Sequence, residues 1–301
     1  MNAVLVPLDG SGFAEQALPL ALSIARRTGA GLDLVRVHVL YALSDPASGF
    51  GPYDPLMEAQ CEDEERLYLN ATMQWLAPLA RVPITSALVH GFTAEGILER
   101  AGTVVADLIV MTTHGLGPVG KFFLGSIADD LIRRGPAPVV VVPHRDRAPG
   151  LIPEPVLERI IIPLDGSKLA EEALVPALDL ARPYQANCTL LQVVRQKEFQ
   201  AEAESYLVRL AGRLRGLDLG VQARVVVAAH AGEAIVHEAE QQPNSLIAMA
   251  THGRGGVMRM LLGSVASKVI RGSTVPVLVC RPGLTAARAK ALQATLIKEL
   301  V

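Results

Sequence analysis

The chain has 301 residues, of which 50% are hydrophobic and only 4% are aromatic, so its length and composition suit two domains with aliphatic cores. The formal net charge is −2 and no block of Lys or Arg stands out, which argues against a nucleic-acid-binding face. The 3 cysteines form no Cys-x-x-Cys pair, which argues against a zinc site or disulfide framework, and no apolar stretch approaches the ~20 residues that span a bilayer.

The chain opens with an apolar run of strand length at 3–8, which Asp9-Gly10-Ser11 ends. This early Asp and the lack of a basic segment before the run argue against a signal peptide, so we expect a cytoplasmic protein. Apolar residues then recur every three or four positions over 11–28. This pattern predicts a helix with Ser11 as its N-cap, Gly29 as its stop and a kink at Pro19.

Strands and helices alternate through the rest of the first half. Strands are expected at 32–40, 83–89, 106–111 and 138–143, and helices at 58–80, 93–101 and 126–134, with a loop rich in Gly and Pro at 41–57. In the last helix, Ser126 and Asp129 predict a capping box and Gly135 predicts the end. Such alternation predicts a parallel sheet that right-handed crossovers cover with helices on both faces.

The pattern then repeats. Positions 7–22 and 163–178 share 11 of 16 residues, and positions 108–128 and 246–266 share 12 of 21. Chance does not produce both matches, so the chain is an internal duplication. We expect two tandem Rossmann-like α/β domains, each with a five-stranded, mostly parallel sheet. Their boundaries are placed at 1–147 and 156–283, with a Pro-rich linker at 148–155 and an amphipathic C-terminal helix at 284–301.

Each half carries a glycine-rich segment between its fourth strand and the next helix. Met111-Thr112-Thr113-His114-Gly115 is followed after nine residues by Gly125-Ser126, and Met249-Ala250-Thr251-His252-Gly253 is followed after nine residues by Gly263-Ser264. Glycine lets backbone N–H groups approach a phosphate, and a helix N-terminus offers unpaired donors and a positive dipole end. Both segments are therefore predicted to bind phosphate.

Ligands of parallel α/β sheets bind beyond the carboxyl ends of the strands. The turns at Asp9 and Asp165 and the second-strand ends near Val39 and Val193 are expected there, beside the glycine segments. A carboxylate suits sugar hydroxyls because it only accepts hydrogen bonds. An Asp-Gly-Ser turn alone is as often a structural cap, but two copies in one arrangement favour a binding site.

Together these motifs resemble the universal stress protein family, in the tandem form of its ATP-binding branch, over nearly the whole length of both halves. That branch carries Gly-x2-Gly-x9-Gly-Ser/Thr. Gly115 and Gly253 match the second glycine, and Thr112 and Ala250 replace the first. The resemblance implies an adenine nucleotide α-hydrolase-like fold that binds ATP, with magnesium, AMP and ADP left open. It also implies that Val139–Val142 and Val277–Cys280 pair across an interface between the two domains.

By the same resemblance, the Asp residues hold the ribose end, Val39 and Val193 present backbone groups to adenine, and the glycine segments cradle the phosphates. The implied site residues are Pro7, Asp9, Val39, Met111, Gly115, Gly125, Ser126 and Ile127 in the first domain, and Pro163, Asp165, Val193, Met249, Ala250, Gly253, Arg254, Gly263, Ser264 and Val265 in the second.

The two sites are not equivalent. Thr112 places a branched side chain where the backbone should approach the ligand, whereas Ala250 is a mild change. Arg254 follows Gly253 and adds charge for a phosphate, whereas Leu116 stands there in the first half; Lys121 and Arg259 serve both. We therefore expect the second domain to be the better ATP binder.

The remaining polar residues show no further site. His114 and His252 lack partners at metal-ligand spacing and are expected to shape the loops. His38, His90, His230 and His237 show no constellation, and the acidic run 62–65 is interpreted as a solvated helix face.

No Walker lysine motif, Gly-x-Ser-x-Gly elbow or Cys/His nucleophile pattern occurs. We therefore expect a nucleotide-binding stress-response protein rather than an enzyme, with slow ATP hydrolysis left open. It is expected to form a homodimer, and the sequence does not identify a protein partner. One alternative is a structural or interaction protein that keeps the fold without the ligand. Another, ranked last, is an adenylyl-transferring or pyrophosphatase enzyme, which would need an HIGH-like or Ser-Gly-Gly-x-Asp-Ser loop after the first strand.

Overall fold

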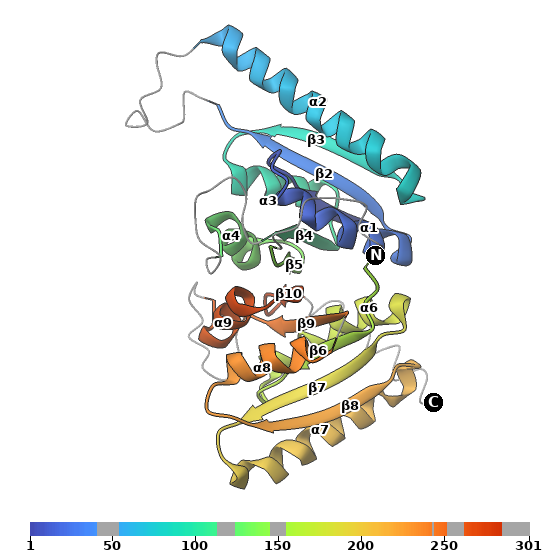
Figure 1. The fold of residues 1–301 in the computed structure, drawn as a ribbon, viewed down its shortest axis with the longest axis vertical. Helices are drawn as coiled ribbons and strands as arrows, with labels where there is room; N and C mark the ends of the chain where they lie inside the picture. Colours follow the sequence, from blue (N-terminus) through green and yellow to red (C-terminus); the bar gives the residue numbers. More distant parts are fainter. Residues whose placement is uncertain (41–53, 113–123, 145–154, 243, 252–261, 285–301) are drawn as a thin grey trace.

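The structure, a computed structural model, describes residues 1–40, 54–112, 124–144, 155–242, 244–251 and 262–284. Two similar α/β halves follow one another along the long axis of the molecule (Figure 1). The strands are β1 (Ala3–Pro7), β2 (Gly31–His38), β3 (Ile84–His90), β4 (Leu108–Thr112) and β5 (Val139–Val142), then β6 (Arg159–Pro163), β7 (Asn187–Val194), β8 (Val221–Val227), β9 (Ser245–Ala250) and β10 (Val277–Cys280).

Helices connect these strands. They are α1 (Leu18–Thr28), α2 (Pro55–Ala80), α3 (Thr93–Thr103) and α4 (Ser126–Arg134), then α5 (Lys168–Glu171), α6 (Leu174–Tyr184), α7 (Gln200–Leu214), α8 (Ala231–Glu240) and α9 (Ser264–Gly272). The order of strands and helices predicted from the sequence is confirmed for these elements. The start of the linker at 148 and all but the first residue of the C-terminal segment 284–301 lie outside the described residues.

The two halves share one ten-stranded sheet in the order β3-β2-β1-β4-β5-β10-β9-β6-β7-β8. Within each half the pairings are parallel, as expected. Between the halves, β5 and β10 pair antiparallel, with Val140 opposite Leu278. The expected pairing of these two valine-rich segments is therefore present. The strand order is symmetrical about this junction, so the carboxyl edge of each half keeps the same local layout.

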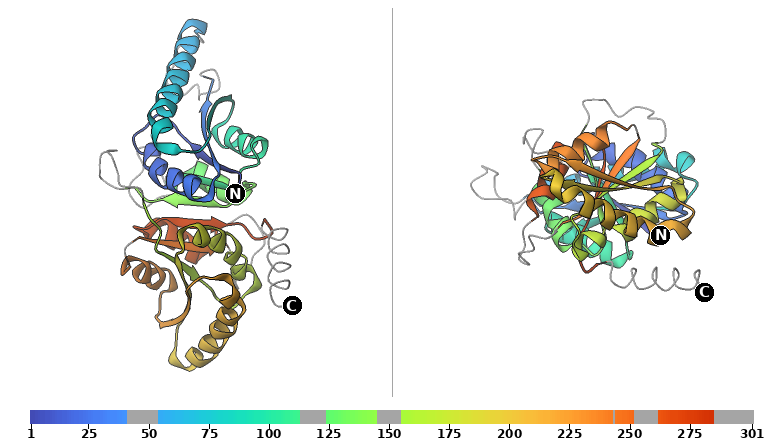
Figure 2. Two further views of the ribbon diagram at one scale, coloured as in Figure 1. Left: turned by 90° about the vertical axis from the view of Figure 1, so that its right-hand side faces the viewer. Right: turned by 90° about the horizontal axis from the view of Figure 1, so that it is seen from below.

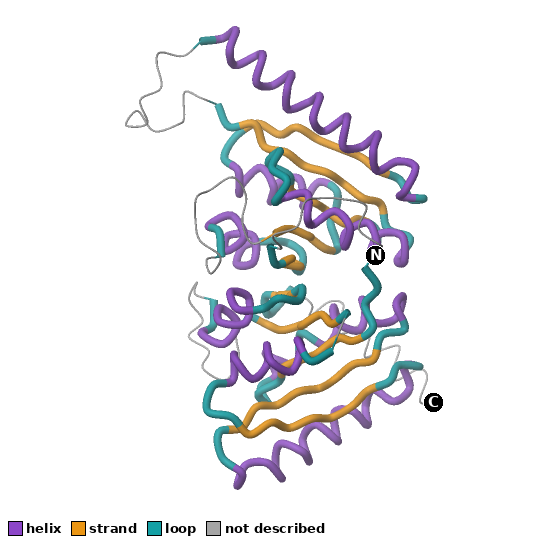
Figure 3. The backbone as a smooth tube through the Cα atoms, in the orientation of Figure 1, coloured by secondary structure: helices purple, strands orange, loops and turns teal. Residues whose placement is uncertain are grey.

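Helices cover both faces of the sheet (Figure 3). Because successive side chains of a strand point to opposite faces, Val4 and Val6 of β1 join the core beneath α1 and α2, whereas Leu5 joins the core beneath α3 and α4. Both cores extend into the second half, where α6 and α7 lie on the first face and α8 and α9 on the other.

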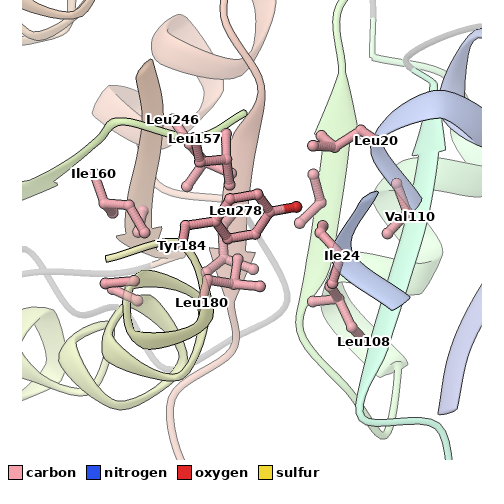
Figure 4. Close-up of a cluster of buried hydrophobic side chains, with 14 of the residues drawn as sticks. Leu20, Ile24, Leu108, Val110, Leu157, Ile160, Leu180, Tyr184, Leu246 and Leu278 are labelled. Atoms are coloured by element: carbon pink, nitrogen blue, oxygen red, sulfur yellow. The ribbon is translucent and has the colours of Figure 1, made fainter. Parts of the chain in front are cut away.

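The junction between the halves is apolar and closely packed. Leu20 and Ile24 of α1 lie across from Leu180, Tyr184 and Leu278 (Figure 4), and all five are buried. The hydroxyl oxygens of Ser23 and Tyr184 are 2.7 Å apart, and Ser23 Oγ donates to the carbonyl of Pro155 at 2.7 Å. Each buried hydroxyl is thus satisfied across the junction, as burial of polar groups requires.

The start of the first helix differs from the sequence prediction. A 3₁₀ turn, η1 (Ala14–Ala17), precedes α1, and Pro19 stands in the first turn of α1, where its missing N–H costs nothing. The predicted kink at Pro19 is therefore wrong. Ser11 is not the N-cap of α1, because Ala17 holds that position. Ser11 Oγ accepts from the backbone N of Ala14 at 3.1 Å, in the turn that leads into η1. Gly29 ends the helix as predicted, with a left-handed φ of 70°.

The capping box predicted for Ser126 and Asp129 is also wrong. Gly125 is the N-cap of α4, no side chain caps the helix, and Asp129 instead forms an ion pair with Arg133 at 2.5 Å. Gly135 follows the last helical residue, as expected. Cys188 and Cys280 are buried in the core, and burial raises the pKa of the Cys188 thiol to about 11, which fits inert thiols.

Candidate functional site

The carboxyl ends of three strands meet at one edge of each half, because β1 lies between β2 and β4, and β6 lies between β7 and β9. Beyond β1, Asp9 Oδ1 accepts from the backbone N of Ser11 at 2.9 Å and from its hydroxyl at 2.5 Å. Beyond β6, Asp165 Oδ1 accepts from the backbone N of Ser167 at 2.9 Å. Both carboxylates thus hold their own turns, while their position at the edge still suits a ligand contact.

These turns need glycine. Gly10 and Gly166 have φ values of 84° and 83°, in the left-handed region that other residues rarely adopt. The Asp-Gly-Ser sequence of each copy is therefore fixed partly by the backbone, and the ligand role of its Asp stays a prediction.

The helices that follow β4 and β9 begin without a side-chain cap. Gly125 and Gly263 are their N-caps, with extended ψ values of 152° and 147°. Glycine has no side chain that could accept a hydrogen bond from the first-turn N–H groups. The first-turn N–H groups of α4 and α9 have no partner within their own helices, and such an end favours an anion such as a phosphate. Ser126 and Ser264, the first residues of the two helices, are exposed.

The first turns differ in charge. Asp129 lies in the first turn of α4 and is followed by Asp130, whereas α9 has Ser267 and Lys268 at these positions and carries no acidic residue in its first turn. Carboxylates at a helix N-terminus oppose the binding of a second anion there. The N-terminus of α9 is therefore more favourable for an anion than that of α4.

Several expected site residues fall outside the described residues: Gly115, Gly253 and Arg254, together with His114, Leu116, Lys121, His252 and Arg259. The others lie on the elements that carry the edge. Pro7 and Pro163 are the last residues of β1 and β6, and Met111 and Met249 are the next-to-last residues of β4 and β9. Thr112 and Ala250 are buried at the ends of β4 and β9, and Ile127 and Val265 lie in the first turns of α4 and α9.

The two valines that are expected to contact adenine, Val39 and Val193, do not occupy equivalent places. Pro7 pairs with Val35 and Pro163 with Leu191, so the residue that corresponds to Val193 is Val37. Val39 lies beyond the end of β2 and is 40% exposed, and its counterpart is Arg195. Val37, rather than Val39, is therefore the residue of the first half whose place in the strand matches that of Val193 in the second.

An arginine fills the space beside the first turn. A Cβ atom added to Gly10 would lie 2.3 Å from Nη1 of Arg36. The guanidinium is held there by Glu65, with Nη2 3.0 Å from Oε1, and lies 5.3 Å from the ring centroid of Tyr68. No sequence motif marks Arg36, so it was not among the predicted site residues.

The second half replaces this ion pair with neutral residues. Gln192 stands where the first half has Arg36, and Ala203 stands where it has Glu65. Gln192 is buried, and its Oε1 has no hydrogen-bond partner in the part of the chain that the structure describes. One polar contact is common to both halves, because Tyr68 donates to Glu15 at 3.0 Å and Tyr206 donates to Glu171 at 3.2 Å.

His38 forms a buried polar cluster that the sequence analysis did not identify. Its Nε2 is 2.5 Å from Glu58 Oε1 and its Nδ1 is 2.7 Å from Glu65 Oε2, while His90 is 3.3 Å from Glu62. The expected absence of a constellation at His38 and His90 is therefore wrong, and so is the expected solvated face at Glu62 and Glu65. Asp63 and Glu64 of the same run are exposed, as predicted. Glu58, Glu62 and Glu65 lie three and four residues apart, so they share one helix face; that spacing was the available signal.

Burial alone would lower the pKa of His38, but hydrogen bonds and charge attraction from Glu65 and Glu58 outweigh it, so the pKa is raised. This cluster ties α2 to the end of β2. Val194 stands at the corresponding place in the second half, so the cluster belongs to the first half alone.

Among the described residues, no group of three or more His, Cys, Asp or Glu side chains could hold a metal ion. None of the helices in the described ranges is long and apolar enough to cross a membrane.

Known proteins of one family are similar to this chain in sequence and in fold. The sequence profile of the universal stress protein family matches residues 1–143 and 157–281. A universal stress protein of Mycobacterium tuberculosis is 32% identical over 297 residues, covering 93% of this chain and 97% of that protein. One from Mycolicibacterium smegmatis is 30% identical over 300 residues, with the same coverage. A crystal structure of a universal stress protein from Archaeoglobus fulgidus has a TM-score of 0.72 at 24% identity and covers 94% of this chain and 99% of its own, which supports the fold.

Proposed function

The chain belongs to the universal stress protein family, as a tandem pair of its domains, and from this premise we propose that it is an ATP-binding regulatory protein of the stress response. Its principal nucleotide site is at the carboxyl edge of the second half. The observation that carries the proposal is the start of α9, where an uncapped helix N-terminus without an acidic first-turn residue adjoins the edge that also carries Asp165.

The residues of this edge fit an adenine nucleotide chemically. Backbone N–H groups at Gly263–Ala266 suit phosphate oxygens, and the Asp165 carboxylate suits ribose hydroxyls. Val193 lies near the end of β7 and is half-buried, which suits contact with an apolar purine face. Bound nucleotide would supply negative charge that stabilises the open helix end.

The first half is proposed as the weaker site. Asp129 and Asp130 oppose a phosphate at α4, and the Arg36–Glu65 pair occupies the space beside Gly10. The same features favour a second candidate function for this half alone, which is a structural role that keeps the fold without a nucleotide. We also propose that the protein binds rather than turns over ATP, because the edge residues named here include no evident general base for attack by water.

Calorimetric titration with ATP and with AMP tests the proposal. Gly263→Val adds a side chain at the start of α9 at backbone angles that valine adopts readily, so folding should be preserved while the phosphate position is obstructed. We expect this variant to lose at least about tenfold in ATP affinity, equal to about 1.4 kcal/mol. The matched variant Gly125→Val should change the main binding event by less than about twofold. Absence of binding by the folded wild-type protein at millimolar ATP would reject the nucleotide function.

A further inference from the structure

We propose that α2 is an interaction surface on which a second copy of this chain docks, with the two α2 helices packed antiparallel. The surface is the stripe Leu67, Ala71, Trp75 and Leu79, called the α2 stripe below. These residues recur every fourth position along a helix, so they form one continuous row. This proposal does not depend on nucleotide binding.

The α2 stripe faces solvent. Leu67 is 66%, Trp75 50% and Leu79 37% exposed, whereas Leu69 and Leu76 of the same helix are buried against the sheet. The helix lies at one end of the long axis, outside β3, and its outer side is not covered by another described element (Figure 1 and Figure 2). A row of large apolar side chains on an outer helix face is unusual for a monomer and is typical of interaction sites.

The fold itself does not require this row. The duplicated helix α7 buries the matching positions Leu207 and Leu214, as α2 buries Leu69 and Leu76. At the places of Leu67, Ala71 and Trp75, however, α7 carries exposed Ser205, Arg209 and Arg213. One helix of the pair thus presents an apolar outer row and the other a polar one, although both serve the same role in their domains.

The α2 stripe is complementary to itself when two copies run antiparallel. In that register Leu67 meets the partner's Leu79, and small Ala71 meets the partner's bulky Trp75, so that the large side chains interdigitate. Exposed Asp63 and Glu64, before the stripe, come close to the partner's Arg81, which follows it. A two-fold interface repeats each such contact, and both its apolar centre and its charged ends therefore match.

The test is sedimentation velocity over a concentration series from about 1 µM to about 1 mM, because a short helix pair makes a small and weak interface. Trp75 is the only Trp of the chain, so its emission reports on the stripe directly. We expect dimer formation within this range and a blue shift of Trp75 emission with the same midpoint.

Leu67→Glu keeps the Trp75 reporter and should weaken the association at least tenfold without loss of the circular dichroism of the folded protein. The matched variant Arg213→Glu on α7 should leave it unchanged. Arg81→Glu should weaken the dimer, and adding Asp63→Lys with Glu64→Lys should restore it.

Three results would overturn the proposal: a monomer at every concentration, a dimer that Leu67→Glu leaves intact, or Trp75 emission that is blue-shifted at all concentrations because another segment of the same chain covers the stripe. Addition of ATP should not be needed for the dimer, so a failure here is separate from failure of the nucleotide function.

Discussion

Single residues make the two duplicated halves chemically different. Arg36, His38 and Glu65 form an ionic cluster beside the first turn, whereas Gln192, Val194 and Ala203 occupy these places in the second half. These three differences remove this group of charges from the second half while the backbone register is kept. The two halves should therefore differ in ligand binding and in pH dependence.

The stability of the first half should depend on the protonation of His38. Its folded-state pKa is raised because the attraction of Glu65 and Glu58 exceeds the effect of burial. The stabilisation is thus fully present below the unfolded pKa of about 6.5 and is lost as pH rises through the raised folded value, at about 1.4 kcal/mol per pKa unit. Denaturant unfolding of the wild type should show this loss, and His38→Gln, which hydrogen-bonds but does not titrate, should remove it.

A His38 imidazole that titrates at or below about 6.5 in NMR spectra would contradict the assigned direction. The variant His237→Gln, on α8 of the second half, is the control for the loss of a histidine outside the cluster.

The sequence predicted the two Asp turns but not the Arg36 and His38 cluster. Asp9 and Asp165 are found through a repeated motif, which is a local signal. Arg36 and His38 acquire their roles only when α2, more than fifteen residues away in the chain, is placed over β2 and brings Glu58 and Glu65 beside them. The spacing of the acidic residues is visible in the sequence, but the strand that they face is set only by the tertiary structure.

At the scale of elements, α4 and α9 are the most informative pair. They have the same length, the same glycine N-cap and the same open first turn, yet α4 carries Asp129 and Asp130 where α9 carries Ser267 and Lys268. Arg133 and Arg134 pair with the two Asp residues at 2.5 and 3.8 Å, so part of their negative charge is offset. The remaining difference still favours an anion at α9.

Placing the charges of α4 on α9 should weaken ATP binding. Ser267→Asp with Lys268→Asp gives α9 the charges that α4 carries at these positions, and two substitutions of about 0.3–1 kcal/mol each predict about threefold to thirtyfold weaker binding. Calorimetry at low and high salt should show the effect shrink as ionic strength rises. Arg271→Asp, in the last turn of α9, is the position control and should leave affinity nearly unchanged. An unchanged affinity in the Ser267→Asp, Lys268→Asp variant would show that the phosphates do not bind at the start of α9.

Element order was predictable because strands and helices have different periods, whereas element starts were less so. Pro19 lies within a long periodic run, and this position predicts a kink in the helix. A 3₁₀ turn precedes it, however, so α1 begins at Leu18 and Pro19 is a favourable first-turn residue. Ser126 and Asp129 match a capping pattern, but Gly125 takes the cap. In both cases the error concerns which of several neighbouring residues begins the helix, and the spacing of residues in the sequence does not decide that.

At the scale of the whole molecule, the two halves form one structural unit. The sheet continues from β5 into β10, and residues of both halves share each of the two cores. Ser23 and Tyr184 add a buried hydrogen bond across the junction. A junction with this much buried apolar surface should couple the unfolding of the halves, because separation would expose it to water.

Leu207→Ala tests that coupling. Leu207 is fully buried in α7 of the second half, so its truncation should cost about 2–5 kcal/mol. Emission of Trp75, which lies in the first half, should report an unfolding transition shifted by the same amount when measured at low protein concentration. Val208→Ala, at a neighbouring position that is 55% exposed, should shift it by less than about 0.5 kcal/mol. A Trp75 transition that Leu207→Ala leaves in place would show that the halves unfold independently.

If the second half holds the principal ATP site, ATP should protect the backbone amides of that half selectively, and amide hydrogen exchange with and without ATP measures this. We expect slower exchange on ATP addition at the N–H groups of Ser264, Val265 and Ala266 and in the Asp165–Ser167 turn, with little change at Ser126–Ala128. Protection confined to the first half, or no protection in either half at millimolar ATP, would contradict it.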